Sequence, residues 1–456
     1  MQSSVESIKK PGLSILETSE LEKIHKASLK ILLETGVNIH SKEIRSLLKK
    51  AGARVKDNLR VFIPNDLIKK ALSTAPPKIN IYNRERKIAM VLEGMNSYFG
   101  TGSDLEYTID HKNHKRRRST LRDVELAARL CEKLPNIDFV MSYSLPSDVS
   151  EQVCEIEQFK AMLQSTNKPI IMTLYSGINN FKKIHNLACI SCEGTENFIK
   201  SPNYIMYGQF VSPLQHDHGA VERLIFCAEN LIPLIYVPTI IMGASGPVTL
   251  AGAIALANAE CLAGLVMHQL SSPGAPFIYG GCISPLDMKT TVYTYGSPEW
   301  RLADIILSQL SNYYNLPIFG TAGATDSKVI DAQAGAEWAL SLLTNALAGT
   351  NLIHDIGYIE SGLTGSLESL VICDEIIGMV KKNISGIEIN EETLALDMIK
   401  NVGPGGNFMG EDHTIKNFKK SIWYPSIFSR NRYENWQNEG LKDILQKASD
   451  CLKGLL

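Results

Sequence analysis

The stretch that decides the fold is PLIYVPTIIMGASGPVTLAGAIALANAECLAGLVMHQLSSPGAPFIYGGCIS, residues 233–284. It begins with an apolar run over 233–242, rich in β-branched residues, which is typical of a strand covered on both faces. A turn containing glycine and proline follows, and a long apolar segment over 248–271 predicts a helix. A second apolar strand is predicted at 277–284. The stretch therefore predicts a strand–helix–strand unit of a parallel sheet.

The same alternation extends along the chain in both directions. We predict strands at 98–104, 137–146, 169–174, 204–211, 233–242, 277–284, 317–325 and 352–358. The helices between and after them are predicted at 119–133, 151–166, 178–197, 217–230, 248–271, 298–314, 329–349 and 366–382. The fold class is therefore α/β, and eight strands alternating with eight helices are typical of a (β/α)8 TIM barrel. A doubly wound open sheet is the alternative, but nothing in that architecture stops the alternation at eight units.

The two ends of the chain differ from this repeating centre. Residues 1–96 are predicted to form an N-terminal helical and β-hairpin extension, with a helix over 21–36 and hairpin-like segments at 53–64 and 78–92. Residues 97–385 form the predicted barrel. Residues 386–456 form a C-terminal extension with a Gly-rich stretch and a helical tail, which we expect to pack on the barrel.

Composition restricts the classes of protein to which the chain can belong. Its 46 Lys+Arg against 48 Asp+Glu give a formal net charge of −2, which argues against nucleic acid as the main partner. Hydrophobic residues make up 44%, too many for a disordered chain. No apolar run approaches the roughly 18 residues of a membrane helix, and the N-terminus lacks a secretory pattern. Nine cysteines without framework spacing fit reduced thiols, so we expect a cytoplasmic location and no membrane.

Active sites of such barrels lie at the C-terminal ends of the strands and in the loops after them. The residues predicted there are rich in aromatic side chains and poor in lysine: Asp104, Tyr143, Tyr175, Gln209, Phe210, Thr239, Tyr279, Cys282, Asp326, His354, Asp355, Tyr358 and Glu360. Ring faces balanced by a few carboxylates are suited to hold a cation. The alternative interpretation is that the rings only cap the barrel core.

Three further features each have a functional and a structural interpretation. Arg301, at the start of a predicted helix, could clamp a substrate carboxylate or be a solvated first-turn residue. His216, Asp217 and His218 could hold a metal or begin a helix, and we expect no metal site there. The basic run HKNHKRRR could be a solvated loop, or it could dock an acidic partner through Lys115, Arg116, Arg117 and Arg118.

Four segments give the chain a family resemblance. They are GPVTLAGAIALANAECLAGLVMHQLSSPGAPFIYG (246–280), ATDSKVIDAQAGAEWAL (324–340), HDIGYIESGLTGSLESLVICDEI (354–376) and VGPGGNFMGEDHT (402–414). With them the chain resembles the trimethylamine methyltransferase superfamily over nearly its whole length. The resemblance implies methyl transfer from a methylamine to the cobalt of a corrinoid protein. The founding branch carries pyrrolysine, whereas this sequence holds only the twenty standard residues. It looks like the branch without pyrrolysine, which demethylates quaternary amines such as glycine betaine, proline betaine and carnitine.

The resemblance implies a glycine betaine-type methyltransferase with a separate corrinoid protein carrying cob(I)alamin as methyl acceptor and no tightly bound cofactor of its own. A quaternary ammonium leaves as a neutral tertiary amine, so no general acid and no catalytic acid–base residue is expected. The protein must position one methyl group, which can contribute roughly 7–11 kcal/mol, and hold a cation. From strand-end position we predict these substrate-binding residues: a cage of Tyr98, Tyr143, Phe210, Tyr279 and Tyr358, charge balance by Asp104 and Glu360, carboxylate binding by Arg301 or His354, and a contact from Gln209.

Other functions stay open at this point. The same family includes the possibility of proline betaine, carnitine or trimethylamine as substrate, and a homologue could bind betaine without chemistry. A zinc-dependent methyltransferase or hydrolase using His216, Asp217 and His218 is a further alternative. Apolar surface around Trp423, Tyr424 and Trp436 predicts a homo-oligomer.

Overall fold

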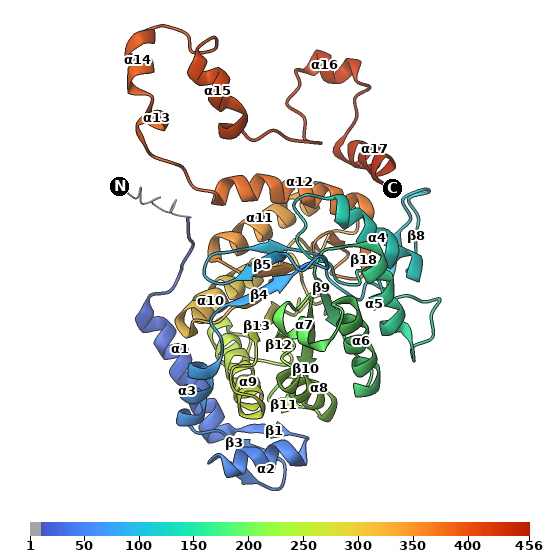
Figure 1. The fold of residues 1–456 in the computed structure, drawn as a ribbon, viewed down its shortest axis with the longest axis vertical. Helices are drawn as coiled ribbons and strands as arrows, with labels where there is room; N and C mark the ends of the chain where they lie inside the picture. The colour runs from blue at the N-terminus through green and yellow to red at the C-terminus, as the bar shows by residue number, and fades with distance from the viewer. Residues whose placement is uncertain (1–10) are drawn as a thin grey trace.

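The computed structural model describes residues 11–456 and shows a closed barrel with helices around it (Figure 1). Seven strands form one parallel sheet in the order β6-β16-β15-β13-β12-β10-β9. Parallel bridges from Gly100 to Phe139 and from Val140 to Ile170 join the two edges of this sheet through residues 139–140. The eight strand positions therefore close in chain order, and the predicted (β/α)8 barrel is confirmed. The strands are β6 (Tyr98–Phe99), β9 (Ile170–Thr173), β10 (Tyr204–Phe210), β12 (Leu234–Met242), β13 (Phe277–Gly280), β15 (Ile318–Thr321) and β16 (Leu352–His354), and β14 (Cys282–Pro285) extends the pairing with β12.

A helix follows each strand position, as predicted. The N-terminus of α4 is closed by a capping box between Thr120 and Asp123, and Asp217 and Asp331 cap α8 and α11. Pro298 occupies the first turn of α10, where its missing N–H has no cost. The helices are α4 (Leu121–Lys133), α5 (Cys154–Ser165), α6 (Ile178–Ser191), α7 (Thr195–Lys200), α8 (His218–Glu229), α9 (Leu250–Ser271), α10 (Pro298–Tyr314), α11 (Ala332–Ala348) and α12 (Leu367–Ile384).

Several predicted elements are shorter than expected, and in three of them the backbone enters the left-handed region within the predicted range. The strand predicted at 98–104 ends at Phe99, before Asp104 (φ 79°), and the strand predicted at 137–146 is reduced to bridges, before Tyr143 (φ 59°). The helix predicted at 178–197 breaks into α6 and α7 at Glu193 and Gly194 (φ 60° and 129°). Such backbone angles end regular structure.

Alternate residues along each strand point to opposite sides, so the barrel has an outer core under the helices and an inner core on its axis. The inner core is apolar and continuous with the hairpin of β4 (Ile79–Tyr82) and β5 (Ile88–Leu92). This hairpin bonds to Asn167, Pro202 and Asn351, which lie just before the strands, and so plugs the N-terminal end of the barrel (Figure 1). The barrel residues of the inner core are Phe139, Met141, Ile171, Ile205, Tyr207, Ile235, Val237, Ile278, Phe319 and Leu352.

The rest of the N-terminal extension packs beside α9. The two predicted hairpins are both present, as β2 with β3 and as β4 with β5. Residues 1–10 of the predicted extension lie outside the described residues. The elements are α1 (Thr18–Lys30), the π-helical turn η1 (Ile31–Thr35), β1 (Val37–Ile39), α2 (Lys42–Lys50), β2 (Arg54–Lys56), β3 (Arg60–Phe62) and α3 (Asn65–Thr74), and β1 also pairs with β11 (Gln215–His216).

A second small sheet, which the sequence did not predict, lies over the C-terminal end of the barrel. It is built from the loops after the first and eighth strands in the order β17-β18-β7-β8. Its strands are β7 (Tyr107–Ile109), β8 (Arg116–Arg118), β17 (Tyr358–Ile359) and β18 (Thr364–Ser366). Tyr358, expected at the end of a barrel strand, therefore belongs to this sheet.

Helix α9 differs from the expectation that no segment is long and apolar enough to span a membrane. Among the described residues, Leu250–Ser271 meets that criterion with a mean hydropathy of 1.7. However, 83% of its most apolar window is buried inside the protein, where it packs against β12 and neighbouring helices. A core helix of this kind satisfies the same criterion without a membrane.

The C-terminal extension has two parts with different surroundings. Helix α17 (Ile444–Leu455) packs against α12 and α4, as expected for a tail on the barrel. Residues 386–425 instead form an arm that projects away from the barrel (Figure 1). All residues of α13 (Glu391–Leu394), α14 (Leu396–Val402) and α15 (Asp412–Ser421) keep solvent exposure, as do those of α16 (Tyr433–Asn438) beyond the arm. Ile387 and Met409 of the arm are 77% and 81% exposed.

Candidate functional site at the C-terminal end of the barrel

The inner face of the barrel changes character towards the C-terminal ends of its strands. Beyond the apolar inner core, the next residues that face the barrel axis are Thr173, Gln209, Thr239, Thr321 and His354. We call this layer the mouth. The Gln209 amide donates to Thr239 Oγ1 over 3.0 Å. Gln209 points inward and is nevertheless exposed, so the barrel axis is open to solvent at this level.

His354 and Asp355 form a buried pair at the mouth. The His354 Nδ1 atom lies 2.9 Å from the Gly320 carbonyl, which can only accept, so Nδ1 carries the proton. Its Nε2 atom faces Asp355 Oδ1 at 3.4 Å. Burial lowers the pKa of His354 to about 4. Burial and the nearby Asp104 raise the pKa of Asp355 well above its usual value. Burial therefore favours the uncharged form of both side chains.

Asp104 is tied to this pair through the loop after β6. Ser103 donates to Asp104 Oδ2 over 2.5 Å and accepts a hydrogen bond of 2.8 Å from Thr173. The Tyr358 hydroxyl donates to the Ser103 carbonyl. A Cβ at Gly102 would overlap both Asp355 Oδ1 and the Tyr358 hydroxyl, so glycine is required for this close approach. Burial raises the pKa of Asp104 to about 6.

An aromatic loop between β14 and α10 covers the same region. The ring centroids of Tyr293, Tyr295 and Trp300 lie 4.8–5.6 Å apart. Asp326 holds the loop by accepting from the backbone N–H groups of Tyr295 at 2.7 Å and Gly296 at 2.9 Å. Burial first, and then the nearby Asp355, raise the pKa of Tyr295. Tyr295 and Asp355 are therefore near enough to interact electrostatically.

The sequence prediction missed Tyr293 and Tyr295. The alternation VYTYG at 292–296, between a strand and the helix of Arg301, was a signal that could have identified them.

Arg301 is buried beneath this loop, so its interpretation as a solvated first-turn residue is wrong. Its Nη1 atom donates to the Thr321 carbonyl over 2.7 Å and lies 3.4 Å from Asp304 Oδ2. Asn345 also donates to Asp304, over 3.1 Å. Burial lowers the pKa of Arg301 and raises the pKa of Asp304 to about 6. The guanidinium is close enough to Asp355 to influence its pKa.

The five rings predicted as a cation cage do not meet at one point. Tyr98 lies at the plugged end, where its hydroxyl accepts from Val91 N over 3.0 Å. Phe210 stacks on Tyr236 at 4.6 Å, on the outer face of β10. The other rings are Tyr279, whose hydroxyl donates to Asn258 over 2.8 Å in the outer core, and Tyr143, which packs 5.9 Å from Tyr358 beside Ser366.

The rings are spread out because some of them face the barrel axis and others face the helices. Odd and even positions of a buried parallel strand are equally apolar, so the sequence does not tell which of them faces the axis. Of the predicted substrate-binding residues, the structure brings together Asp104, His354 and Tyr358 around the mouth, with Gln209 above them and Arg301 beside them.

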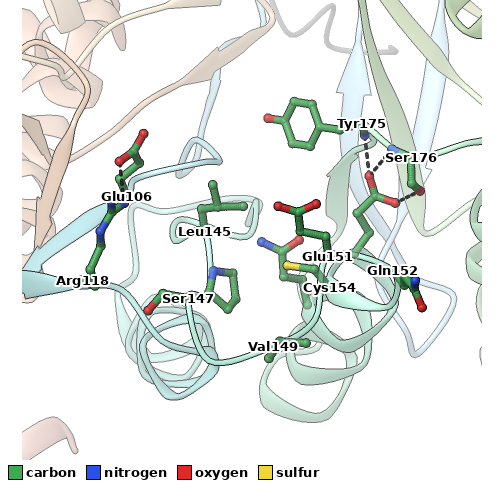
Figure 2. Close-up of a pocket in the computed structure, with 13 residues that line it drawn as sticks. Glu106, Arg118, Leu145, Ser147, Val149, Glu151, Gln152, Cys154, Tyr175 and Ser176 are labelled. Carbon is green, nitrogen blue, oxygen red and sulfur yellow. Dashed lines mark hydrogen bonds and ion pairs between the residues drawn. The ribbon is translucent and has the colours of Figure 1, made fainter.

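Figure 2 shows a separate hollow of about 610 Å³, which is lined by loops at the same end of the barrel. Its lining comes from the loops after the first three strand positions and from the start of α5. Glu155 accepts from Ser176 N over 2.7 Å and also from Tyr175 N, which fixes the loop after β9. Tyr175 lines this hollow, and its hydroxyl lies beside Asp104. The hollow is therefore adjacent to the mouth. Its other lining residues are Glu106, Arg118, Leu145, Pro146, Ser147, Val149, Glu151, Gln152, Cys154 and Gln158.

Comparison with known proteins shows the family to which the chain belongs. Residues 2–456 match the family model described as trimethylamine methyltransferase (MTTB). The chain belongs to the trimethylamine methyltransferase family. It is accordingly an enzyme of the methyltransferase class.

Two curated relatives and one solved structure illustrate the match. The trimethylamine methyltransferase MttB of Desulfitobacterium hafniense is 33% identical over 98% of this chain and 90% of its own length. The glycine betaine methyltransferase of Desulfitobacterium hafniense strain Y51 is 30% identical over 95% and 90%. The solved monomethylamine methyltransferase MtmB of Methanosarcina barkeri superposes with a TM-score of 0.55 over 97% of this chain and 89% of its own, at 11% identity, which supports the fold alone.

Acidic side chains of the same protein pair with the arginines of the basic run HKNHKRRR. Arg116 pairs with Glu360 at 2.8 Å, and Arg118 pairs with Glu106 at 2.6 Å. Arg117 lies between Asp110 at 2.9 Å and Asp123 at 2.7 Å. Lys115 is exposed at the preceding turn. Glu360, predicted to balance a bound cation, is therefore engaged with Arg116, and docking through this run stays a prediction.

The residues considered for zinc do not form a site. His216 is fully buried, with Nδ1 3.0 Å from the Tyr236 hydroxyl, whereas Asp217 caps α8 and His218 is exposed. Within residues 11–456, no group of three or more His, Cys, Asp or Glu side chains is arranged to hold a metal ion. Cys189 and Cys192 have the C-x-x-C spacing of some zinc and redox sites, and they are buried free thiols at the end of α6.

Proposed function

We propose that this enzyme transfers a methyl group from a quaternary amine, glycine betaine or a close relative, to cob(I)alamin carried by a separate corrinoid protein. The observation that carries the proposal is the pair of buried carboxyls, Asp104 and Asp355, beside tyrosine rings at the open end of the barrel. Burial is the main cause of both raised pKa values, and Arg301 offsets only part of the rise at Asp355. A quaternary ammonium would add positive charge that stabilises the ionised forms.

The mouth suits a cation that cannot donate a hydrogen bond. Ring faces attract such a cation with about 0.5–2 kcal/mol each, and the pKa values of Tyr207, Tyr293, Tyr295 and Tyr358 respond to Asp355. His354 is neutral and does not repel the ammonium. Because the tertiary amine leaves without a proton, the reaction requires no general acid.

The arrangement also fits an acceptor that arrives from outside. Cob(I)alamin supplies a strong nucleophile that takes the methyl group directly. The open axis above Gln209 gives a large acceptor access to a methyl group held at the mouth. The role of the protein is to hold the ammonium between Asp355 and the rings so that one methyl group points outward along the axis.

We extend the proposal to the setting of the reaction. All nine cysteines, each in the described part of the chain, are free thiols, which agrees with a reducing cytoplasm. The exposed apolar side chains of the arm, Ile387 and Met409 among them, agree with self-association. The corrinoid protein would approach the face that carries Lys115.

The test is an anaerobic assay that follows the cob(I)alamin absorbance with a panel of glycine betaine, proline betaine, carnitine, choline and trimethylamine. We expect loss of the cob(I) band and formation of methylated cobalamin with at least one betaine. Conversion of trimethylamine alone would support the proposed reaction and show that the substrate is trimethylamine rather than a betaine. Saturable betaine binding without transfer, with both free and protein-bound corrinoid, would instead indicate a binding protein.

A further inference from the structure

The start of α10 concentrates polar atoms that lack partners. Tyr293 Oη, Ser297 Oγ and Arg301 Nε are buried and have no hydrogen-bond partner within residues 11–456, and Trp300 Nε1 is a fourth such atom in this segment. Tyr293, Ser297 and Arg301 are spaced four residues apart, so Ser297, the N-cap of α10, and Arg301 lie on one face of the helix. A buried donor without a partner costs about 1–3 kcal/mol, so three at one place indicate a missing acceptor.

The chemistry of the three groups defines that acceptor. A guanidinium can only donate, and each hydroxyl can donate. Arg301 is only 5% exposed, and the N-terminus of the 17-residue helix α10 adds a partial positive charge. The occupant is therefore an anionic oxygen group.

Two of the three residues pack against Trp300. The Tyr293 ring centroid and the Arg301 Cζ atom each lie 5.3 Å from the Trp300 ring. Burial lowers the pKa of Arg301, and Asp304 first, then Tyr293, Asp326 and Asp355, act against that effect. Asp304 already pairs with Nη1, at 3.4 Å, and leaves Nε for another acceptor.

A cationic and an anionic group lie within electrostatic reach of each other in this region. Arg301 and Asp355 influence each other's pKa, and Asp104 also acts on Asp355. A molecule that carries an ammonium and a carboxylate a short distance apart would match both groups at once. Choline, which has the same trimethylammonium but an alcohol in place of the carboxylate, would match only one.

We propose that Tyr293, Ser297 and Arg301 bind the carboxylate of a zwitterionic betaine and thereby select betaines over uncharged or purely cationic methylamines. This inference rests on the function proposed above, because it assigns one end of that substrate. Tyr293 and Ser297 act by binding and take no part in methyl transfer.

The experiment compares glycine betaine with choline by titration calorimetry on the full-length protein. We expect the wild type to bind glycine betaine at least tenfold more tightly. The Tyr293→Phe variant removes a hydroxyl that has no partner among the described residues, so it should fold as well as the wild type. It should lose betaine affinity about 10- to 100-fold, the range for a hydrogen bond to a charged group, and should lose far less choline affinity.

Tyr313→Phe is the matched control, because Tyr313 lies near the C-terminal end of α10, away from Ser297 and Arg301, and is 42% exposed. It should leave both affinities unchanged. Arg301→Gln provides a second variant, with a larger expected loss for betaine and a gain in relative preference for choline. Equal affinity of the wild type for the two ligands, or equal losses for both ligands in Tyr293→Phe, would overturn the carboxylate site.

The two proposals fail in different ways. Methyl transfer from choline or trimethylamine without preference for betaine would overturn the carboxylate site and leave the methyltransferase proposal in place. Selective betaine binding that depends on Tyr293, with no transfer to any corrinoid, would support the carboxylate site and overturn the proposed reaction.

Discussion

The two ends of the barrel axis are built from the same strands and differ completely in chemistry. At the N-terminal end, the β4–β5 hairpin packs Ile81 and Met90, both fully buried, against the inner core. At the C-terminal end, the same strands present Gln209, His354 and threonines to a region open to solvent. One end is optimised for packing, while the other keeps buried carboxyls in unfavourable surroundings. From this difference we expect stability to reside at the plug and function at the mouth.

The largest expected effect tests the plug. Ile81→Ala should lower the free energy of unfolding by about 2–5 kcal/mol, because it leaves a cavity in a closed apolar core. The activity per folded molecule should not change. Denaturant unfolding and kinetics at a fixed temperature check both statements. Ile88→Ala, on the paired strand and 56% exposed, is the control and should change neither quantity.

The next effect tests the mouth. Asp355→Asn should weaken binding of a quaternary amine by roughly 100-fold, because it removes the carboxylate that balances the cation. The fold should survive, since the amide replaces a carboxyl held near neutrality. Asp57→Asn is a matched control, because Asp57 is exposed and shares the left-handed backbone of Asp355 (φ 51° and 73°). Undiminished amine affinity in Asp355→Asn would place the cation elsewhere.

A pH titration separates function from stability at Asp104. Its pKa of about 6 lies above the unfolded value, so its contribution to stability is present below about pH 4 and is lost as the pH rises through 6. A bound cation favours the ionised form, so amine affinity should fall as the pH decreases through about 6.

Asp104→Asn should raise the free energy of unfolding at pH 7 by about 1–2 kcal/mol, lower amine affinity about tenfold and remove this pH dependence. Asparagine also tolerates the backbone angle of this position, φ 79°. Calorimetric unfolding and binding between pH 5 and 8 provide the readouts. A destabilised variant with normal binding would contradict the assignment.

The smallest effect tests the aromatic loop. Tyr295→Leu keeps apolar bulk and removes the ring face, so affinity for a quaternary amine should fall about 2- to 30-fold. The affected quantity is the dissociation constant, measured by calorimetry. Tyr424→Leu, at an exposed position of the arm, controls for the substitution. Affinities equal to the wild type would exclude Tyr295 from the cation site.

The sequence predicted the barrel because its signal is local. Apolar runs and the helices between them, such as 233–242 followed by 248–271, are visible in any window of the chain. The plug was visible only as a hairpin at 78–92, since its place inside the barrel depends on contacts with Pro202 and Asn351, far along the chain.

The candidate site could be predicted only in part. Asp104, His354 and Tyr358 were found because they follow strands, but Phe210 and Tyr279 were included although they face the outer core. On a uniformly apolar strand, the sequence does not show which residues face the barrel axis. The burial of Arg301 depends on Thr321 and Asp304, and the importance of Tyr295 depends on a loop held by Asp326.

The most direct test of the central claim is a crystal structure of the protein with glycine betaine bound. The account predicts difference density at the mouth, with the trimethylammonium between Asp355 and Tyr295 and the carboxylate at Arg301. Density confined to the neighbouring hollow lined by Glu151 and Leu145, with the mouth holding only solvent, would contradict it.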